Sequence, residues 1–152
     1  MNVFEELAAE WYEFQGYCVR KNVTYGKGRS GGIGIEMDLI ACRLGSDPVH
    51  LESTVTSGPT AIEKLKKHFT EAKEAYREVL NVAPCKVKQK AIVFSAKDRS
   101  KLEDDGVEVM SKDEFMKTIV EAMEKKNLST DSVPHSLPLL RVVQEVVHLL
   151  RK

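Results

Sequence analysis

The alternation of apolar and polar positions divides the chain into helices and strands. Apolar residues recur at helical spacing over residues 3–14. A longer stripe follows, and Thr60 with Glu63 forms a capping box that would begin its helix. Two further helices are predicted over about 112–126 and 139–150. The longer stripe consists of Ile62, Leu65, Phe69, Ala72, Tyr76 and Val79.

Shorter apolar runs between these helices are typical of β-strands. The last two are short apolar runs of the kind seen in interior strands of a sheet. Helices and strands in this order predict an α/β fold with a mixed central sheet flanked by helices. The predicted strands cover residues 17–25, 33–43, 48–55, 89–96 and 107–111.

The length of 152 residues suits one domain with a C-terminal extension. We expect a domain over residues 1–126, a polar, proline-containing linker over 127–138, and an apolar helix within 139–152. That helix is apolar around most of its circumference, so it needs either a groove on its own domain or a second subunit. No apolar run approaches the ~18 residues that span a membrane, and the N-terminus lacks a signal-peptide pattern. We therefore expect a cytoplasmic protein with no membrane partner.

The charge is balanced overall but unevenly distributed. The chain has 23 Lys and Arg against 23 Asp and Glu. Acids dominate residues 1–60 and bases dominate 61–101, which suits a polyanion bound beside a metal, although a solvated helix face also explains many of the lysines. Cys18, Cys42 and Cys85 lie in apolar, strand-like runs and are predicted to be buried free thiols.

Two neighbouring strands carry acids on one face. In the first, alternation places Glu36 and Asp38 opposite the apolar residues. In the second, His50, Glu52 and Thr54 share a face. If the strands pair as a hairpin, all five side chains line one side, where crowded carboxylates repel unless a proton or a cation intervenes. Mg²⁺ or Mn²⁺ would meet that need, and an exposed face with ordinary surface charge is the alternative.

The first helix adds another acid. Steps of about 100° per residue place Glu5 at the edge of the apolar stripe, where it could reach the sheet. Glu6, Glu10 and Glu13 fall on the side away from that stripe. A favourable acid in the first turn of a helix explains Glu5 equally well.

The order of these segments resembles the PD-(D/E)xK nuclease superfamily, which has the restriction-endonuclease-like fold. The resemblance covers about residues 3–111 and rests on the helix with Glu5, GYCVRKN, a glycine-rich turn, IEMDLIA, VHLEST, a long helix and a further strand. Within this superfamily, the chain is similar above all to Holliday junction resolvases and Mrr-type endonuclease domains. The resemblance therefore implies a restriction-endonuclease-like mixed sheet and metal-dependent cleavage of DNA.

The resemblance also implies roles for individual residues. Asp38 and Glu52 would bind Mg²⁺ or Mn²⁺, helped by the backbone carbonyl of Leu51. The catalytic acid of the first helix falls on Glu5, with its neighbour in the sequence, Glu6, as the alternative. The lysine of the E-x-K motif falls on Thr54, and here the chain departs from the family.

The departure matters because Thr54 has a hydroxyl but no charge. Losing one preorganised donor beside the attacking water costs about 10²–10³ in rate. Three explanations stay open. A cation from elsewhere fills the space, with Lys64 of the long helix first and Arg29 or Lys27 of the glycine-rich turn next; the enzyme works slowly with metal alone; or the domain has kept the fold and lost the chemistry.

Basic residues around the glycine-rich turn predict contact with DNA phosphates. These residues are Arg20, Lys21, Lys27 and Arg29. The leading hypothesis is a metal-dependent DNA endonuclease, or a DNA-binding protein derived from one, that acts as a homodimer because two sites cut two strands. The alternative is a catalytically inactive assembly module whose C-terminal helix mediates association.

Overall fold

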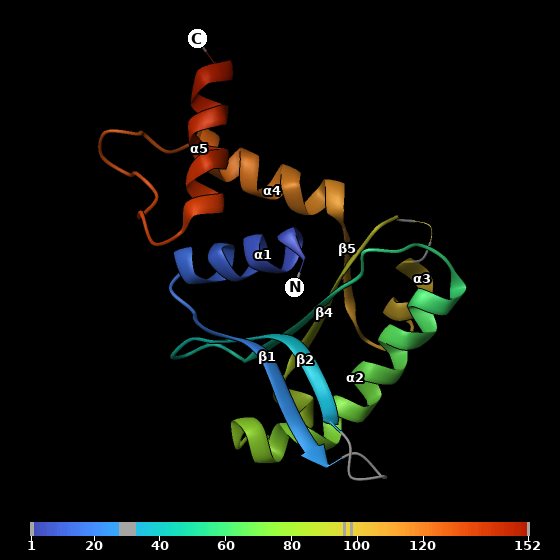
Figure 1. Cartoon of the computed structure of the whole chain (residues 1–152). Helices are drawn as coiled ribbons and strands as arrows, with labels where there is room; N and C mark the ends of the chain where they lie inside the picture. The colour runs from blue at the N-terminus through green and yellow to red at the C-terminus, as the bar shows by residue number, and fades with distance from the viewer. Residues whose placement is uncertain (1, 28–32, 96, 98, 152) are drawn as a thin grey trace.

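The computed structural model describes residues 2–27, 33–95, 97 and 99–151. A five-stranded mixed sheet is flanked by helices, which confirms the predicted α/β class (Figure 1). The helices are α1 (Val3–Phe14), α2 (Pro59–Leu80), α3 (Arg99–Glu103), α4 (Lys112–Glu124) and α5 (Pro138–Leu150), with a 3₁₀ turn, η1, at Pro84–Lys86. The strands are β1 (Cys18–Lys27), β2 (Ile33–Cys42), β3 (Val49–Ser53), β4 (Lys88–Val93) and β5 (Glu108–Ser111).

The strands lie in the order β1-β2-β3-β4-β5. The first three form an antiparallel meander, whereas β3, β4 and β5 run parallel. Parallel strands need a crossover between them, and α2 and α3 provide the two crossovers. As a result, β3, β4 and β5 end at one side of the sheet, which we call the carboxyl edge.

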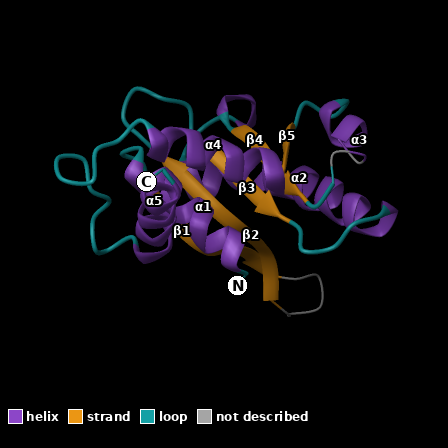
Figure 2. Cartoon of the chain, turned by 90° about the horizontal axis from the view of Figure 1, so that it is seen from above, coloured by secondary structure: helices purple, strands orange, loops and turns teal. Residues whose placement is uncertain are grey.

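Each face of the sheet buries its own apolar layer. Viewed from above (Figure 2), α1, α4 and α5 lie over the strands, and their core includes Leu51 of β3 and Ile92 of β4. On the other face, α2 buries the stripe that the sequence predicted, from Ile62 to Tyr76. Side chains alternate along a strand, so β3 sends Leu51 to the first layer and leaves its neighbours for the second.

The long helix α2 begins differently from the prediction. Its N-cap is Gly58, at φ 110°, followed by Pro59 at the first helical position. Proline suits that position because the missing N–H would have no partner there. Thr60 already lies inside the helix and makes no capping bond, so the predicted capping box of Thr60 and Glu63 is wrong. Capping boxes begin α1 and α4 instead.

The C-terminal helix packs against α1 and α4. The carboxylate of Glu10, buried on α1, accepts hydrogen bonds from the backbone N–H groups of Leu139 (3.3 Å) and Leu140 (2.7 Å). These N–H groups belong to the first turn of α5, where an anion is favoured by the helix dipole. Glu10 therefore faces α5, although the sequence placed it on the side away from the apolar stripe.

The segment 127–138, predicted as a linker, is fastened to the domain. Val133 and Leu137 are buried in the core, and the Val133 N–H donates to Oε1 of Gln144 at 2.8 Å. The opposite face of α5 is open to solvent and apolar. Its exposed side chains are Val142, Val146, Leu149 and Leu150.

The three cysteines are free, as expected, but they are less buried than the sequence suggested. Cys18 and Cys85 are exposed, and Cys42 is half-buried. Cys18 begins the edge strand β1 and Cys85 lies in η1, and neither position is covered by a second layer. Within the described residues, no helix is both long enough and apolar enough to cross a membrane.

Candidate functional site

Strands β2 and β3 part at the two predicted acids. Their backbone pairing extends from Ala41 opposite Val49 to Leu39 opposite Leu51 and stops there. Beyond that point, hydrogen bonds from backbone N–H groups to the carboxylates of Asp38 and Glu52 take the place of backbone pairing between the strands. The Asp38 N–H donates to Glu52 Oε1 at 3.3 Å, and the Ser53 N–H donates to Asp38 Oδ2 at 2.9 Å. Each carboxylate thus satisfies the backbone of the other strand, which holds the two acids together.

The ladder is interrupted on the other side of Asp38 as well. The β1–β2 register pairs Lys21 with Leu39 and Val23 with Met37, but it omits Asn22 and Asp38. Asn22 has a left-handed backbone, at φ 51°, a conformation that asparagine tolerates better than most residues. Asp38 therefore sits at a break in the sheet on both sides.

Glu52 is the end of a buried chain of hydrogen bonds. Gln89 Nε2 donates to Tyr76 Oη at 2.9 Å. Tyr76 Oη lies 2.5 Å from His50 Nδ1, and His50 Nε2 lies 2.7 Å from Glu52 Oε1. An ionised carboxylate accepts hydrogen bonds only, so we assign the proton of His50 to Nε2 and let Tyr76 donate to Nδ1. His50 and Glu52 are 0% and 2% exposed, so the predicted alternative of an ordinary exposed face does not hold here.

The two acids differ in proton affinity. Burial by itself would raise the pKa of Glu52, but hydrogen bonds from His50 and His68 outweigh it and lower the pKa to about 2. Burial raises the pKa of Asp38 to about 7, and the charges of Glu52 and Glu5 add to the rise, while the Ser53 N–H opposes it. At neutral pH, Glu52 is a fixed anion and Asp38 shares its site with a proton.

A cavity of about 190 Å³ opens beside this pair, between the end of β3 and α2. We call it the acid pocket. Among its lining residues are Asp38, Glu52, Thr54, Lys64 and His68. The structure thus brings together four of the five predicted catalytic residues.

The position of the missing motif lysine is occupied by a hydroxyl that is already engaged. Thr54 Oγ1 donates to the carbonyl of Thr56 at 2.9 Å and accepts from its N–H at 3.2 Å. Lys64 lines the same pocket from α2 and is exposed, with no ion pair among the described residues. Lys64 is therefore free to meet an anion, whereas Thr54 is held in a local turn.

His68 is a pocket residue that the sequence analysis missed. Its Nδ1 lies 3.5 Å from Glu52 Oε2, and the hydrogen bond to Glu52 raises the pKa of His68. In the sequence, His68 is isolated from other histidines. The available signal was its spacing of four residues from Lys64, which places both on one face of a helix.

Other predicted residues lie outside the pocket. Glu5 reaches back to cap its own helix, where its Oε2 accepts from the Asn2 N–H at 3.1 Å, although its charge acts on Asp38. Glu6, the reserve for this role, pairs with Lys21 at 2.8 Å. Leu51, whose backbone carbonyl was the predicted ligand, is not among the residues that line the acid pocket, and its side chain packs on the opposite face of the sheet.

The predicted DNA contacts are only partly visible. Arg20 is exposed on β1, and the ammonium of Lys21 is engaged by Glu6. The side chain of Lys27 and the whole of Arg29 lie outside the described residues. Arg20 is therefore the one member of the four whose side chain is described and not paired with a described acid.

The donor set of the acid pocket fits a hard divalent cation that keeps part of its water shell. In the described part of the chain, no group of three or more His, Cys, Asp or Glu residues is arranged to hold a metal. Mg²⁺, however, is usually bound by one or two carboxylates, with waters and substrate phosphates as the other ligands. Asp38 Oδ1 accepts no hydrogen bond from the described residues, and Glu52 Oε2 has a second lone pair beside the one that faces His68. Two carboxylate oxygens are thus available to such an ion.

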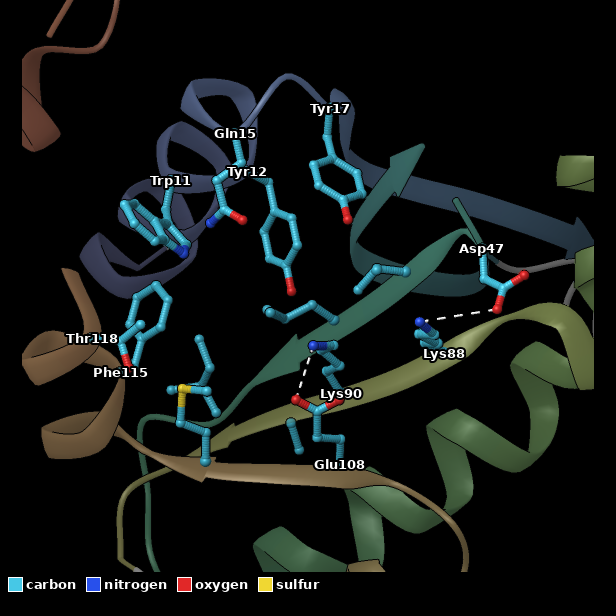
Figure 3. Close-up of a pocket in the computed structure, with 15 residues that line it drawn as sticks. Trp11, Tyr12, Gln15, Tyr17, Asp47, Lys88, Lys90, Glu108, Phe115 and Thr118 are labelled. Carbon is cyan, nitrogen blue, oxygen red and sulfur yellow. Dashed lines mark hydrogen bonds and ion pairs between the residues drawn. The ribbon is translucent and has the colours of Figure 1, made fainter. Parts of the chain in front are cut away.

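A second cavity, of about 260 Å³, lies on the opposite face of the sheet (Figure 3). It has aromatic walls from α1 and α4, and Tyr12 points into it. Its charges cancel in pairs, because Lys90 lies 2.9 Å from Glu108 and Lys88 lies 4.0 Å from Asp47. This cavity lacks the unbalanced acids that make the acid pocket a candidate for metal binding.

Comparison with protein-family models, with curated proteins and with solved structures gave no match to this chain. The resemblance in motif order to PD-(D/E)xK nucleases therefore stays a prediction from the sequence.

Proposed function

We propose that the protein is a metal-dependent DNA endonuclease of the PD-(D/E)xK type. The observation that carries the proposal is the pairing of Asp38 and Glu52 at the point where β2 and β3 part. Two carboxylates held together in a low-dielectric pocket favour a cation, and the pKa of about 7 at Asp38 expresses that demand. A cation that bridges them to a phosphodiester would meet it.

Each pocket residue has a role in this proposal. Asp38 and Glu52 would hold Mg²⁺ or Mn²⁺, which lowers the pKa of a bound water and polarises the phosphate. Lys64 would supply the positive charge that the motif lysine supplies in the family, since it lines the pocket and Thr54 does not carry charge. His50 orients Glu52 through the Tyr76 hydrogen bond, as partners of metal ligands commonly do.

The partner of this site would be DNA, with Arg20 contributing to the phosphate contacts. A cytoplasmic location accords with that partner.

We also propose a homodimer formed through α5, because Val142, Val146 and Leu149 expose apolar area to water, at a cost of about 25 cal/mol per Å². Light scattering should show a dimer that Val146→Glu converts to a monomer, and a monomeric wild type would exclude this interface.

The exposed face of α5 also favours a second function, an assembly module that has kept the fold and lost hydrolysis. The engagement of Glu52 by His50 and His68 would serve such a protein as a purely structural feature. The two functions differ in one respect that is easily measured. An endonuclease cleaves DNA and needs Asp38 to do so, whereas an assembly module cleaves no DNA.

The test is nicking of supercoiled plasmid in Mn²⁺. We expect cleavage by the wild type, none by Asp38→Asn, and a loss of about 10²-fold in Lys64→Ala. Lys67→Ala is the matched control, because Lys67 lies on the same helix and does not line the pocket, and it should cut like the wild type.

Thr54→Lys separates the explanations of the missing lysine. If Lys64 already serves, a second cation beside it brings no gain. If the chain is slow for want of a charge, the rate should rise about 10²-fold. Failure of the wild type and of Thr54→Lys to cut, with Mn²⁺ bound and the fold intact, would exclude the endonuclease and leave the assembly module.

A further inference from the structure

An exposed aromatic side chain stands at the carboxyl edge of the sheet. Phe94 directly follows β4 and is 57% exposed. Within the described part of the chain, it is the one aromatic residue among the large apolar side chains that are open to solvent. A single exposed apolar side chain is ordinary on a protein surface, so any role of this ring depends on what lies beside it.

A cation lies against this ring. The Nζ atom of Lys112, at the start of α4, is 5.4 Å from the centroid of the Phe94 ring and 4.6 Å from that of Phe4. Both distances fall within the range of cation–π attraction. Figure 1 shows the starts of α1 and α4 on the same side of the molecule. We call Phe4, Phe94 and Lys112 the aromatic platform.

The platform and the acid pocket lie at the same edge of the sheet, on opposite faces. Ser53 pairs with Ile92 in the parallel ladder, and the Thr54 N–H donates to the Ile92 carbonyl at 3.0 Å. Phe94, two residues beyond Ile92, therefore follows β4 at the edge where Thr54 follows β3, with its ring toward α1 and α4, while the pocket lies toward α2. The start of α1 makes a second connection, because Phe4 of the platform is followed by Glu5, whose charge acts on Asp38.

We propose that Phe94 stacks on an unpaired base of single-stranded DNA while Lys112 binds a neighbouring phosphate of the same strand. The inference rests on the proposed function and adds the class of its substrate: a strand with unpaired bases that enters the acid pocket over the carboxyl edge. Every base has a π-face on which an aromatic side chain can stack, so the contact needs no particular sequence. In a duplex the faces of the bases are already stacked on each other, so Phe94 would have no surface to meet.

The ring and the cation match the two parts of a nucleotide. Phe94 offers an apolar face to the base, and the ammonium of Lys112 offers charge to the phosphate. A second face of exposed apolar residues, on α5, lacks this combination, because its exposed large side chains are aliphatic. The chemistry of the platform therefore favours a nucleic acid over an apolar protein surface.

The experiment measures binding separately from cleavage. A fluorescein-labelled oligothymidylate of about twelve nucleotides, within the usual site size, is titrated by fluorescence anisotropy in EDTA, which removes divalent cations. A duplex of equal length is the comparison. Phe94→Ala should weaken binding of the single strand about tenfold and leave duplex binding unchanged. Phe94→Trp should bind as tightly as the wild type, whereas Phe94→Leu, which keeps apolar area without a π-face, should behave like Phe94→Ala.

Two controls complete the design. Leu44→Ala removes an exposed apolar side chain in the turn between β2 and β3 and should leave the affinity unchanged. Lys112→Gln should reduce the slope of affinity against salt by about one phosphate contact. The proposal is overturned if the wild type does not bind the single strand, if Phe94→Ala binds it like the wild type, or if Phe94→Leu does.

These outcomes are independent of plasmid nicking. Cleavage in Mn²⁺ without any dependence of single-strand binding on Phe94 would retain the endonuclease and reject the platform. Binding that depends on Phe94, in a protein that cuts nothing, would retain the platform and reject hydrolysis.

Discussion

The ends of β2 and β3 carry the same chemical group in two different surroundings. The carboxylate of Glu52 is buried and that of Asp38 is partly buried, yet the pKa of Asp38 rises to about 7 and that of Glu52 falls to about 2. Burial acts on both in the same direction. The difference lies in the donors, because two histidines face Glu52, whereas one backbone N–H reaches the side chain of Asp38.

This comparison teaches that hydrogen-bond donors, more than depth, decide which buried acid keeps its charge. At the end of β3, the fold itself supplies the hydrogen-bond donors that keep Glu52 ionised. At the end of β2, by contrast, Asp38 has no positively charged partner among the described residues. A cation that enters the pocket is expected to complete the Asp38 side.

The largest effect on stability should come from removing the charge of Glu52. Glu52→Gln should lower the free energy of unfolding at pH 7 by about 3 kcal/mol, because it removes a buried carboxylate that the two histidines stabilise in its ionised form. The folded pKa of Glu52 lies below the unfolded value, so its contribution is present above about pH 4.5 and is lost as the pH falls toward 2. Urea unfolding at pH 7 and pH 3 measures this. An equal loss at both pH values would contradict the assignment of Glu52 as an ionised group.

A smaller effect should follow from cutting the chain of donors behind Glu52. Tyr76→Phe leaves His50 Nδ1 and the Gln89 amide without their shared partner, which should cost about 2 kcal/mol in unfolding free energy. Tyr12→Phe is the matched control, because the Tyr12 hydroxyl, on a side chain only 9% exposed, makes no hydrogen bond with the described residues. Equal effects of the two substitutions would show that the Tyr76 hydroxyl does not support Glu52.

The smallest effect should be an increase in stability when the charge of Asp38 is removed. The folded pKa of Asp38 lies above its ordinary value of about 4, so ionised Asp38 destabilises the fold as the pH rises from about 4 to 7. Asp38→Asn should therefore raise the unfolding free energy at pH 8 by about 1–2 kcal/mol, below the full value of the pKa shift because the group is partly open to solvent. At pH 4 the two proteins should unfold alike. A loss of stability at pH 8 would remove the contrast between the two acids.

Sequence patterns were sufficient where periodicity and burial agree. The stripe of α2 and the alternation in β3 correctly placed Ile62, Phe69, His50 and Glu52, since apolar area and strand geometry alone determine these positions. The motif order also placed Thr54 and Lys64 beside the acids, although they come from different elements. A motif reports spacing along the chain, and here that spacing matches the order in which the elements pack.

Features that depend on tertiary contacts were missed. Glu10 was assigned to the solvent side of α1, because helical spacing does not show that the start of α5 would lie over it. His68 was missed because its partner Glu52 is sixteen residues earlier on another element, and its local signal was limited to the spacing from Lys64. The predicted cap at Thr60 failed because Gly58 and Pro59 begin the helix earlier. Each of these errors arises where a distant contact or a backbone turn overrides a short pattern.

The central claim, that Asp38 and Glu52 form a cation site, is tested most directly by calorimetric titration with Mn²⁺ at pH 8. We expect one bound ion in the wild type and none in Asp38→Asn or Glu52→Gln. Asp47→Asn, which alters an acid of the second cavity, should leave binding unchanged. Binding of Mn²⁺ by both pocket variants as by the wild type, or no binding by the wild type, would contradict the claim.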